Sequence, residues 1–104
     1  MSRGPDAATQ LERALLASAG AAECPLAIIE ADLTRWASVT FTGARHMLTL
    51  AGRASAALTR WVDALPEAEF ALRGHLVADL SVEAVRREGS EVRVMLEILT
   101  VEER

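Results

Sequence analysis

The chain has 104 residues, of which 51% are hydrophobic, and a formal net charge of -4 at pH 7. A chain of this size forms one domain that buries roughly two-thirds of its unfolded surface, so residues 1–104 are treated as a single domain. The acidic balance argues against a nucleic-acid surface, because phosphate binding needs clustered Arg and Lys, whereas here only Arg86 and Arg87 adjoin.

Neither a disulfide nor a membrane span is expected. The single cysteine, Cys24, cannot form an internal disulfide, and its place before Pro25 favours a small buried side chain over a reactive thiol. The apolar run Ala14–Ala22 is too short to span a membrane, and Asp6 and Glu12 interrupt the positive region of a signal peptide. We therefore predict a cytoplasmic protein. All eleven basic residues are Arg, which is typical of a GC-rich bacterial genome.

The N-terminal part predicts a disordered tail over residues 1–6, followed by a helix. Thr9 with Glu12 three residues later indicates a capping box, and Gly20 is expected to end the helix. The apolar stripe of this helix consists of Leu11, Leu15 and Ala19.

A long strand is expected from Leu26 to Thr42, because the odd positions are apolar apart from Arg35. Seventeen residues exceed the usual strand length, so we expect a bend or bulge near Leu33 to Trp36. Gly43 and Ala44 suit a two-residue hairpin turn. Under that register Phe41 faces His46, Val39 faces Leu48, and Ala37 faces Leu50.

A second helix is predicted from Ser55 to Leu65, with Pro66 preventing its continuation. Trp61 lies on its apolar stripe and is expected in the core. The stripe is formed by Ala54, Ala57, Leu58, Trp61, Val62 and Leu65.

The segment from Phe70 to Val101 predicts a second hairpin, because two runs of alternating apolar residues meet at a Gly-containing turn. We expect a three-residue loop at Arg87 to Gly89, with Gly89 in the left-handed conformation. A two-residue turn at Glu88 and Gly89 would instead set Leu80 opposite Glu97. In the favoured register Ala84 faces Val92, Val82 faces Val94, Leu80 faces Leu96, and Ala78 faces Ile98.

The predicted fold class is therefore α+β in the chain order αββαββ, with two helices on one face of a four-stranded sheet. The second strands of the hairpins, Arg45–Ala51 and Val92–Val101, are expected in the middle because they are apolar on both faces. Such an arrangement is a circularly rearranged relative of the ferredoxin-like split unit. The repeated pattern of helix and hairpin is compatible with an internal duplication.

No motif in the chain indicates a metal, cofactor or nucleophile site. The glycines stand singly at expected turns, and no phosphate loop or dinucleotide fingerprint is present. His46 is expected to point inward as a core residue with one hydrogen bond, and His75 to lie solvated on the opposite face near Val101. The two histidines are therefore not expected to converge, and neither has a third ligand at metal spacing.

Two carboxylates are predicted to meet on the sheet face that the helices leave uncovered. In the favoured register Asp79 lies opposite Glu97, while Glu83 pairs with Arg93. The like charges could share a proton, bind a cation or receive an Arg from a partner chain, or they could splay into water, which exposed carboxylates do cheaply.

The same uncovered face is predicted to carry an apolar patch, and such a patch marks an interaction surface. The main hypothesis is a non-catalytic interaction module that forms a homodimer through this face. The alternative is a small-molecule-binding protein or enzyme, with Trp36 as a stacking wall and Asp79 and Glu97 as an acid pair. The expected apolar set is Trp36, Met47, Val77, Met95, Leu99 and Val101.

Overall fold

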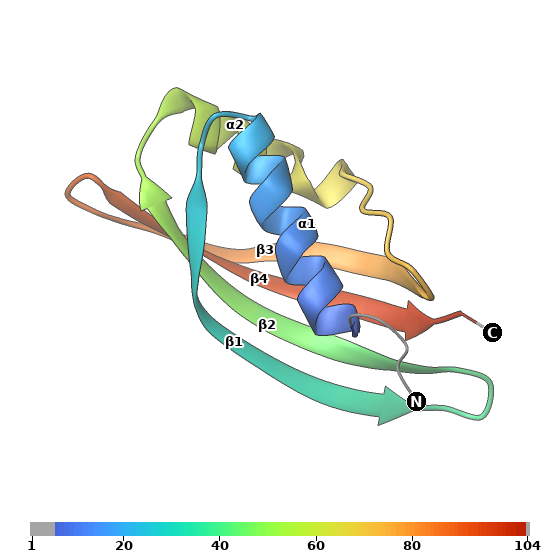
Figure 1. Ribbon diagram of the computed structural model, residues 1–104. Coiled ribbons are helices and arrows are strands. Elements are labelled where there is room, and N and C mark those ends of the chain that lie inside the picture. Colours follow the sequence, from blue (N-terminus) through green and yellow to red (C-terminus); the bar gives the residue numbers. More distant parts are fainter. Residues whose placement is uncertain (1–5, 104) are drawn as a thin grey trace.

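A computed structural model describes residues 6–103 of the chain. The fold is α+β, with two helices packed on one face of a four-stranded antiparallel sheet (Figure 1). The predicted order αββαββ is confirmed. The elements are α1 (Ala7–Ala21), β1 (Leu26–Ala37), β2 (Thr42–Arg53), α2 (Ala56–Ala64), the 3-10 turn η1 (Leu65–Glu67), β3 (His75–Glu88) and β4 (Glu91–Glu102).

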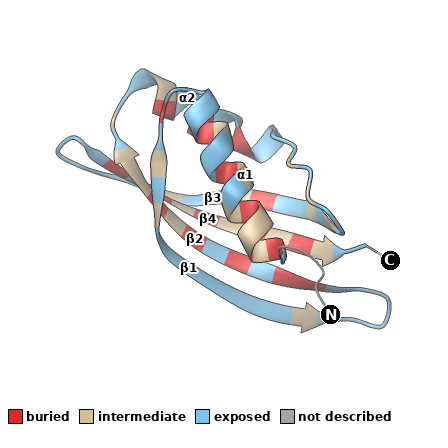
Figure 2. Ribbon diagram, in the orientation of Figure 1, coloured by how far each residue is buried: buried red, intermediate tan, exposed pale blue. Residues whose placement is uncertain are grey.

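The strand order is β1-β2-β4-β3, so β2 and β4 lie in the middle as predicted. The buried residues gather on these central strands and on the inner faces of the helices (Figure 2). Every second residue of β4 from Val92 to Thr100 is buried, which is the alternation of a strand with one face in the core.

Helix α1 begins at a different cap from the predicted one. Asp6, not Thr9, is the N-cap, and its carboxylate accepts a hydrogen bond of 2.8 Å from the backbone N–H of Thr9. This bond lowers the pKa of Asp6, because it favours the charged carboxylate. Residues 1–5 of the predicted disordered tail lie outside the described part of the chain.

The end of α1 also differs from the prediction, because Gly20 lies inside the helix. The left-handed conformation is taken by Glu23, at φ 64°, and the backbone N–H of Cys24 then reaches the carbonyl of Ala19 at 2.9 Å. Cys24 itself is buried, as predicted, and burial raises the pKa of its thiol.

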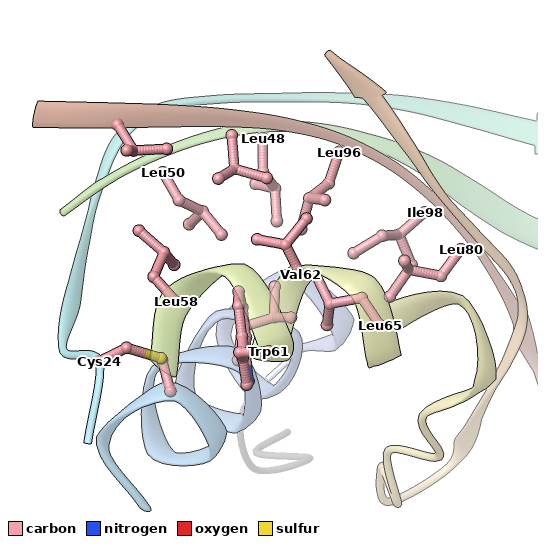
Figure 3. Packing of buried hydrophobic residues seen from close by; sticks show 14 of the residues in the cluster. Cys24, Leu48, Leu50, Leu58, Trp61, Val62, Leu65, Leu80, Leu96 and Ile98 are labelled. Carbon is pink, nitrogen blue, oxygen red and sulfur yellow. The ribbon is translucent and has the colours of Figure 1, made fainter. Parts of the chain in front are cut away.

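Helix α2 closes the core from the same side as α1. Ser55 is its N-cap, and Trp61 is only 8% exposed, as predicted. The indole N–H of Trp61 donates to the hydroxyl of Ser18 at 2.9 Å and so links the two helices. Figure 3 shows the stripe of α2 pointing at the strands; its cluster includes Leu58, Trp61, Val62, Leu65, Leu48, Leu50, Leu80, Leu96 and Ile98.

The first hairpin turns earlier than predicted. β1 ends at Ala37, and a four-residue turn precedes β2, so the seventeen-residue strand and the turn at Gly43 are both wrong. Ser38 stabilises the real turn: its backbone N–H donates to the carbonyl of Phe41 at 2.7 Å, and its hydroxyl accepts from the Phe41 N–H at 3.0 Å. The irregularity of β1 lies between Ile28 and Glu30, not near residues 33–36. The observed pairs are Leu33 with His46, Ala31 with Leu48, and Ile28 with Leu50.

The second hairpin has a two-residue turn at Gly89 and Ser90, so the predicted three-residue loop is wrong. Gly89 does take the left-handed conformation, at φ 63°. Bulges at Ala78 and Glu83 shift the register twice, which neither predicted register contains. The observed pairs are Arg87 with Val92, Val85 with Val94, Val82 with Leu96, and Leu80 with Ile98.

Candidate functional site: the open face of the sheet

The open face is the side of the sheet turned away from the helices. The pairing of the strands arranges its residues in rows, each of which crosses the sheet in the order β1, β2, β4 and β3. From the end near the first turn, the rows are Trp36–Gly43–Val101–Leu76, Thr34–Arg45–Leu99–Asp79, Asp32–Met47–Glu97–Ser81, Glu30–Thr49–Met95–Ala84, and Ala27–Ala51–Arg93–Arg86.

The first of these rows, which we call the apolar row, contains no polar side chain other than the indole N–H of Trp36. The indole occupies the space that a side chain at Gly43 would need, since a Cβ there would lie 2.6 Å from the ring. Leu76 at the other end of the row is 55% exposed. The apolar row therefore presents a continuous apolar strip across all four strands.

Trp36 carries the one buried side-chain polar atom without a hydrogen-bond partner that residues 6–103 contain, its indole Nε1. A shielded donor without an acceptor costs free energy, so an added acceptor near Trp36 would be stabilising. Beside the indole lies a shallow hollow of about 320 Å³, lined by Thr34, Trp36, Arg45 and Leu99.

The predicted carboxylate pair is not formed. Asp79 lies opposite Leu99, and Ser81 is opposite Glu97, because the turn at Gly89 and Ser90 and the bulge at Glu83 set a different register. Glu97 instead accepts from Arg45 of the same chain, with Nε and Oε2 3.1 Å apart. Neither carboxylate lines the hollow beside Trp36.

The predicted pair of Glu83 with Arg93 is also wrong. Glu83 is the bulged residue, and its carboxylate accepts from the hydroxyl of Ser81 at 2.7 Å. Arg86 is the residue opposite Arg93, so two like charges face each other across β3 and β4. Arg93 binds Glu91 at 2.9 Å, and this contact raises its pKa.

Most of the predicted interface residues do lie on the open face. Met47 is 42% exposed, whereas Trp36, Met95, Leu99 and Val101 are half-buried by their row neighbours. Val77 is the exception, because it lies opposite Thr100 and packs against the core. Leu76 takes its place on the open face, and only knowledge of the bulge would have identified it.

A second polar site lies on the helix side, where His46 is buried at 2% exposure. Its Nε2 lies 2.9 Å from the hydroxyl oxygen of Thr100. Since that hydroxyl donates to the carbonyl of Ala44 at 3.4 Å, it accepts from His46, which assigns the proton to Nε2. The prediction of an inward histidine with one hydrogen bond is confirmed, although Leu33 rather than Phe41 is its neighbour in the sheet.

His75 lies closer to His46 than predicted. It is half-buried on the helix side, opposite Glu102, and lines a cavity of about 70 Å³. Asp6, Arg35 and Thr100 also line this cavity, whose volume suits about two water molecules. Residues 6–103 contain no group of three His, Cys, Asp or Glu side chains that could hold a metal ion.

His46 is expected to make the protein less stable in mild acid. Burial lowers its pKa below 6.5, with His75 lowering it further and Asp6 opposing the shift. The unfolded chain therefore binds a proton that the folded chain resists, so the free energy of unfolding falls as the pH drops through about 6.5. Urea unfolding at pH 7.5 and 5.5 measures this loss.

The matched variants are His46→Leu and His75→Gln. His46→Leu should abolish most of the loss between the two pH values, whereas His75→Gln should retain the part caused by burial of His46. An undiminished loss in His46→Leu would assign the pH dependence to other groups.

None of the helices within residues 6–103 is long and apolar enough to cross a membrane. A scan against models of known protein families gave no match, and a search of curated proteins found no significant relative. The open face must therefore be interpreted from its own residues.

Proposed function

We propose that this protein is a non-catalytic interaction module that forms a homodimer through the open face of its sheet. The observation that carries the proposal is the apolar row, which crosses all four strands and which no element within residues 6–103 covers. An uncovered apolar strip of this kind is typical of an interaction surface.

The size of the open face supports the same proposal. Strands of about 12 residues, spaced about 4.8 Å apart with a rise of about 3.3 Å per residue, give a face of roughly 750 Å². Stable protein interfaces bury roughly 800 Å² on each partner. One open face against another thus has the area that a specific dimer needs.

The edges of the sheet are less suited to self-association. Both edge strands carry bulges, at Ile29 in β1 and at Ala78 and Glu83 in β3. Bulges interrupt the row of free backbone groups that a strand from another chain would pair with. The open face is therefore favoured over edge-to-edge pairing.

Leu99→Arg is expected to convert the dimer into a folded monomer. Leu99 lies next to the apolar row on a central strand, so a two-fold contact buries two new charges without partners. Light scattering coupled to gel filtration at micromolar concentration measures the mass, and circular dichroism verifies the fold. Val85→Arg is the control, because Val85 is 52% exposed but belongs to the helix side. A monomeric wild type would refute the proposal.

The alternative function, binding of a small molecule, is supported by fewer of the predicted features. The hollow beside Trp36 favours a ligand that packs against the indole, but the acid pair is absent because Asp79 lies opposite Leu99 and Glu97 binds Arg45. A monomeric wild type would make this hollow the candidate site.

Three finer predictions from the sequence accompany the proposal. The strand order supports a circularly rearranged ferredoxin-like unit, and composition supports a bacterial origin and a cytoplasmic location. Each stays a prediction.

A further inference from the structure

The charges of the open face are distributed unevenly over its strands. β1 contributes two exposed carboxylates, Glu30 and Asp32, and no basic side chain. At the other edge of the same face, Arg86 of β3 lies directly opposite Arg93 of β4. Like charges that face each other across a strand pair are destabilising unless carboxylates offset them. Glu91 binds Arg93 at 2.9 Å, so Arg86 is a cation that a carboxylate of a second chain would stabilise.

A face-to-face homodimer has its two-fold axis in the plane of the interface. When the two sheets pack with their strands aligned, this axis runs close to one of two directions, across the strands or along them. An axis across the strands lays β1 on β1 of the second copy, so Asp32 lies over its own copy and Glu30 stands one row from the second copy's Asp32. It also reverses the order of the rows, which places Val101 and Leu76 of the apolar row against Arg93 and Arg86 of the second copy. This orientation combines like-charge repulsion with poor burial of the apolar row.

An axis along the strands preserves the order of the rows and exchanges the two edges. β1 then lies over β3 of the second copy, and the apolar row meets the apolar row. Within it, Trp36 lies over Leu76 and Gly43 over Val101, so Val101 and Leu76 of one chain face the indole that lies over Gly43 of the other. Size and polarity both match in this orientation.

The same axis brings Glu30 near Arg86 of the second copy, while Asp32 stands one row from the second copy's Asp79. Glu30 stands one row from the level of Arg86, a displacement of about 7 Å along the strand. Sheets that pack face to face lie about 10 Å apart, and the flexible Glu and Arg side chains together span such an offset. Each dimer would contain two of these contacts at its rim.

We infer that the two chains of the dimer are related by a two-fold axis parallel to the strands, with Glu30 of each chain paired with Arg86 of the other. The inference rests on the proposed dimer and specifies its geometry. Recognition then combines the central apolar row with two symmetric ion pairs, which select this orientation of a second copy over the crossed one.

Charge reversal tests the inference through the dimer dissociation constant. Glu30→Arg and Arg86→Glu should each weaken the dimer by about tenfold or more, because each places like charges together twice. The double variant should return to within about threefold of wild type, since its charges are again opposite. Sedimentation velocity in low salt provides the constants. Glu67→Arg, on the exposed turn after α2, is the control that should leave the constant unchanged.

A mixing experiment adds a readout that a structural defect cannot imitate. Chains with Glu30→Arg and chains with Arg86→Glu are each weakened as homodimers, because each homodimer sets like charges together at both rim contacts. In the mixed dimer, native Glu30 of one chain meets native Arg86 of the other, and the two substituted side chains form a second contact of opposite charges. The mixture should therefore form a heterodimer of near wild-type affinity, and added salt should reduce this preference.

The neutral variant Glu30→Gln distinguishes between the two possible directions of the two-fold axis. It should weaken the dimer if the axis lies along the strands, because an attraction is lost, and strengthen it if the axis crosses them, because a repulsion is removed. A dimer that Leu99→Arg disrupts but that shows independent effects of Glu30 and Arg86 would overturn the inferred axis and leave the proposed function standing. A monomeric wild type would overturn both.

Discussion

Replacing Trp61 with alanine is expected to lower the free energy of unfolding by about 3–5 kcal/mol, the loss typical of a large aromatic side chain removed from a core. Trp61 is 8% exposed and packs between α2, α1 and the sheet. The substitution leaves a cavity between the layers and also deprives Ser18 of its donor, the indole N–H at 2.9 Å. Urea unfolding at a fixed protein concentration, followed by circular dichroism, measures the loss.

Ser18→Ala is the matched control for Trp61, because it removes the hydrogen-bond acceptor and retains the indole. Its cost should be about 0.5–1.5 kcal/mol, the net value of one hydrogen bond. Equal losses in the two variants would mean that the bond, and not the filling of the core, is what Trp61 contributes.

Gly43→Ala is expected to destabilise the protein by about 1–3 kcal/mol, the usual cost of overpacking. A Cβ at this position would overlap the carbonyl oxygen of Thr100, which is backbone of the neighbouring strand and cannot rotate away. It would also lie 2.6 Å from the indole of Trp36 and displace it from the sheet. Urea unfolding reports the loss, and near-ultraviolet circular dichroism reports the movement of the indole.

Gly20→Ala provides the comparison for Gly43. Gly20 lies inside α1, and a Cβ added there would meet no atom within 4 Å, so alanine should stabilise the helix by about 0.5–1 kcal/mol. The same substitution of glycine by alanine is therefore expected to raise the free energy of unfolding at Gly20 and to lower it at Gly43. A neutral Gly43→Ala would show that the sheet adjusts at this point without cost.

Local pattern was sufficient to predict the elements and their layers. The stripe of Leu11, Leu15 and Ala19 and the stripe around Trp61 repeat at helical spacing, and both are buried as expected. The apolar residues on both faces of β2 and β4 likewise predicted their central place in the sheet. These features follow from burial of one face of each element, which the order of apolar residues records directly.

The position of the first turn was not predicted correctly, because a glycine can serve either a turn or close packing and a serine can also form a turn. Gly43 resembles a turn glycine, but its missing side chain serves close packing under Trp36. Ser38 makes the actual turn through hydrogen bonds to Phe41. Only the packing around residue 43 decides between these uses of a small residue.

The composition of the candidate site was decided by the tertiary structure. Alternation along β3 assigns Leu76 to the core and Val77 to the open face, and the bulge at Ala78 exchanges them. The turn at Gly89 and Ser90 and the bulge at Glu83 together set Asp79 opposite Leu99 and not Glu97. A bulge inserts one residue into a strand with a period of two, so each one reverses the face of all residues beyond it. The sequence by itself therefore determined the elements and their layers, whereas the register between strands decided which side chains share the open face.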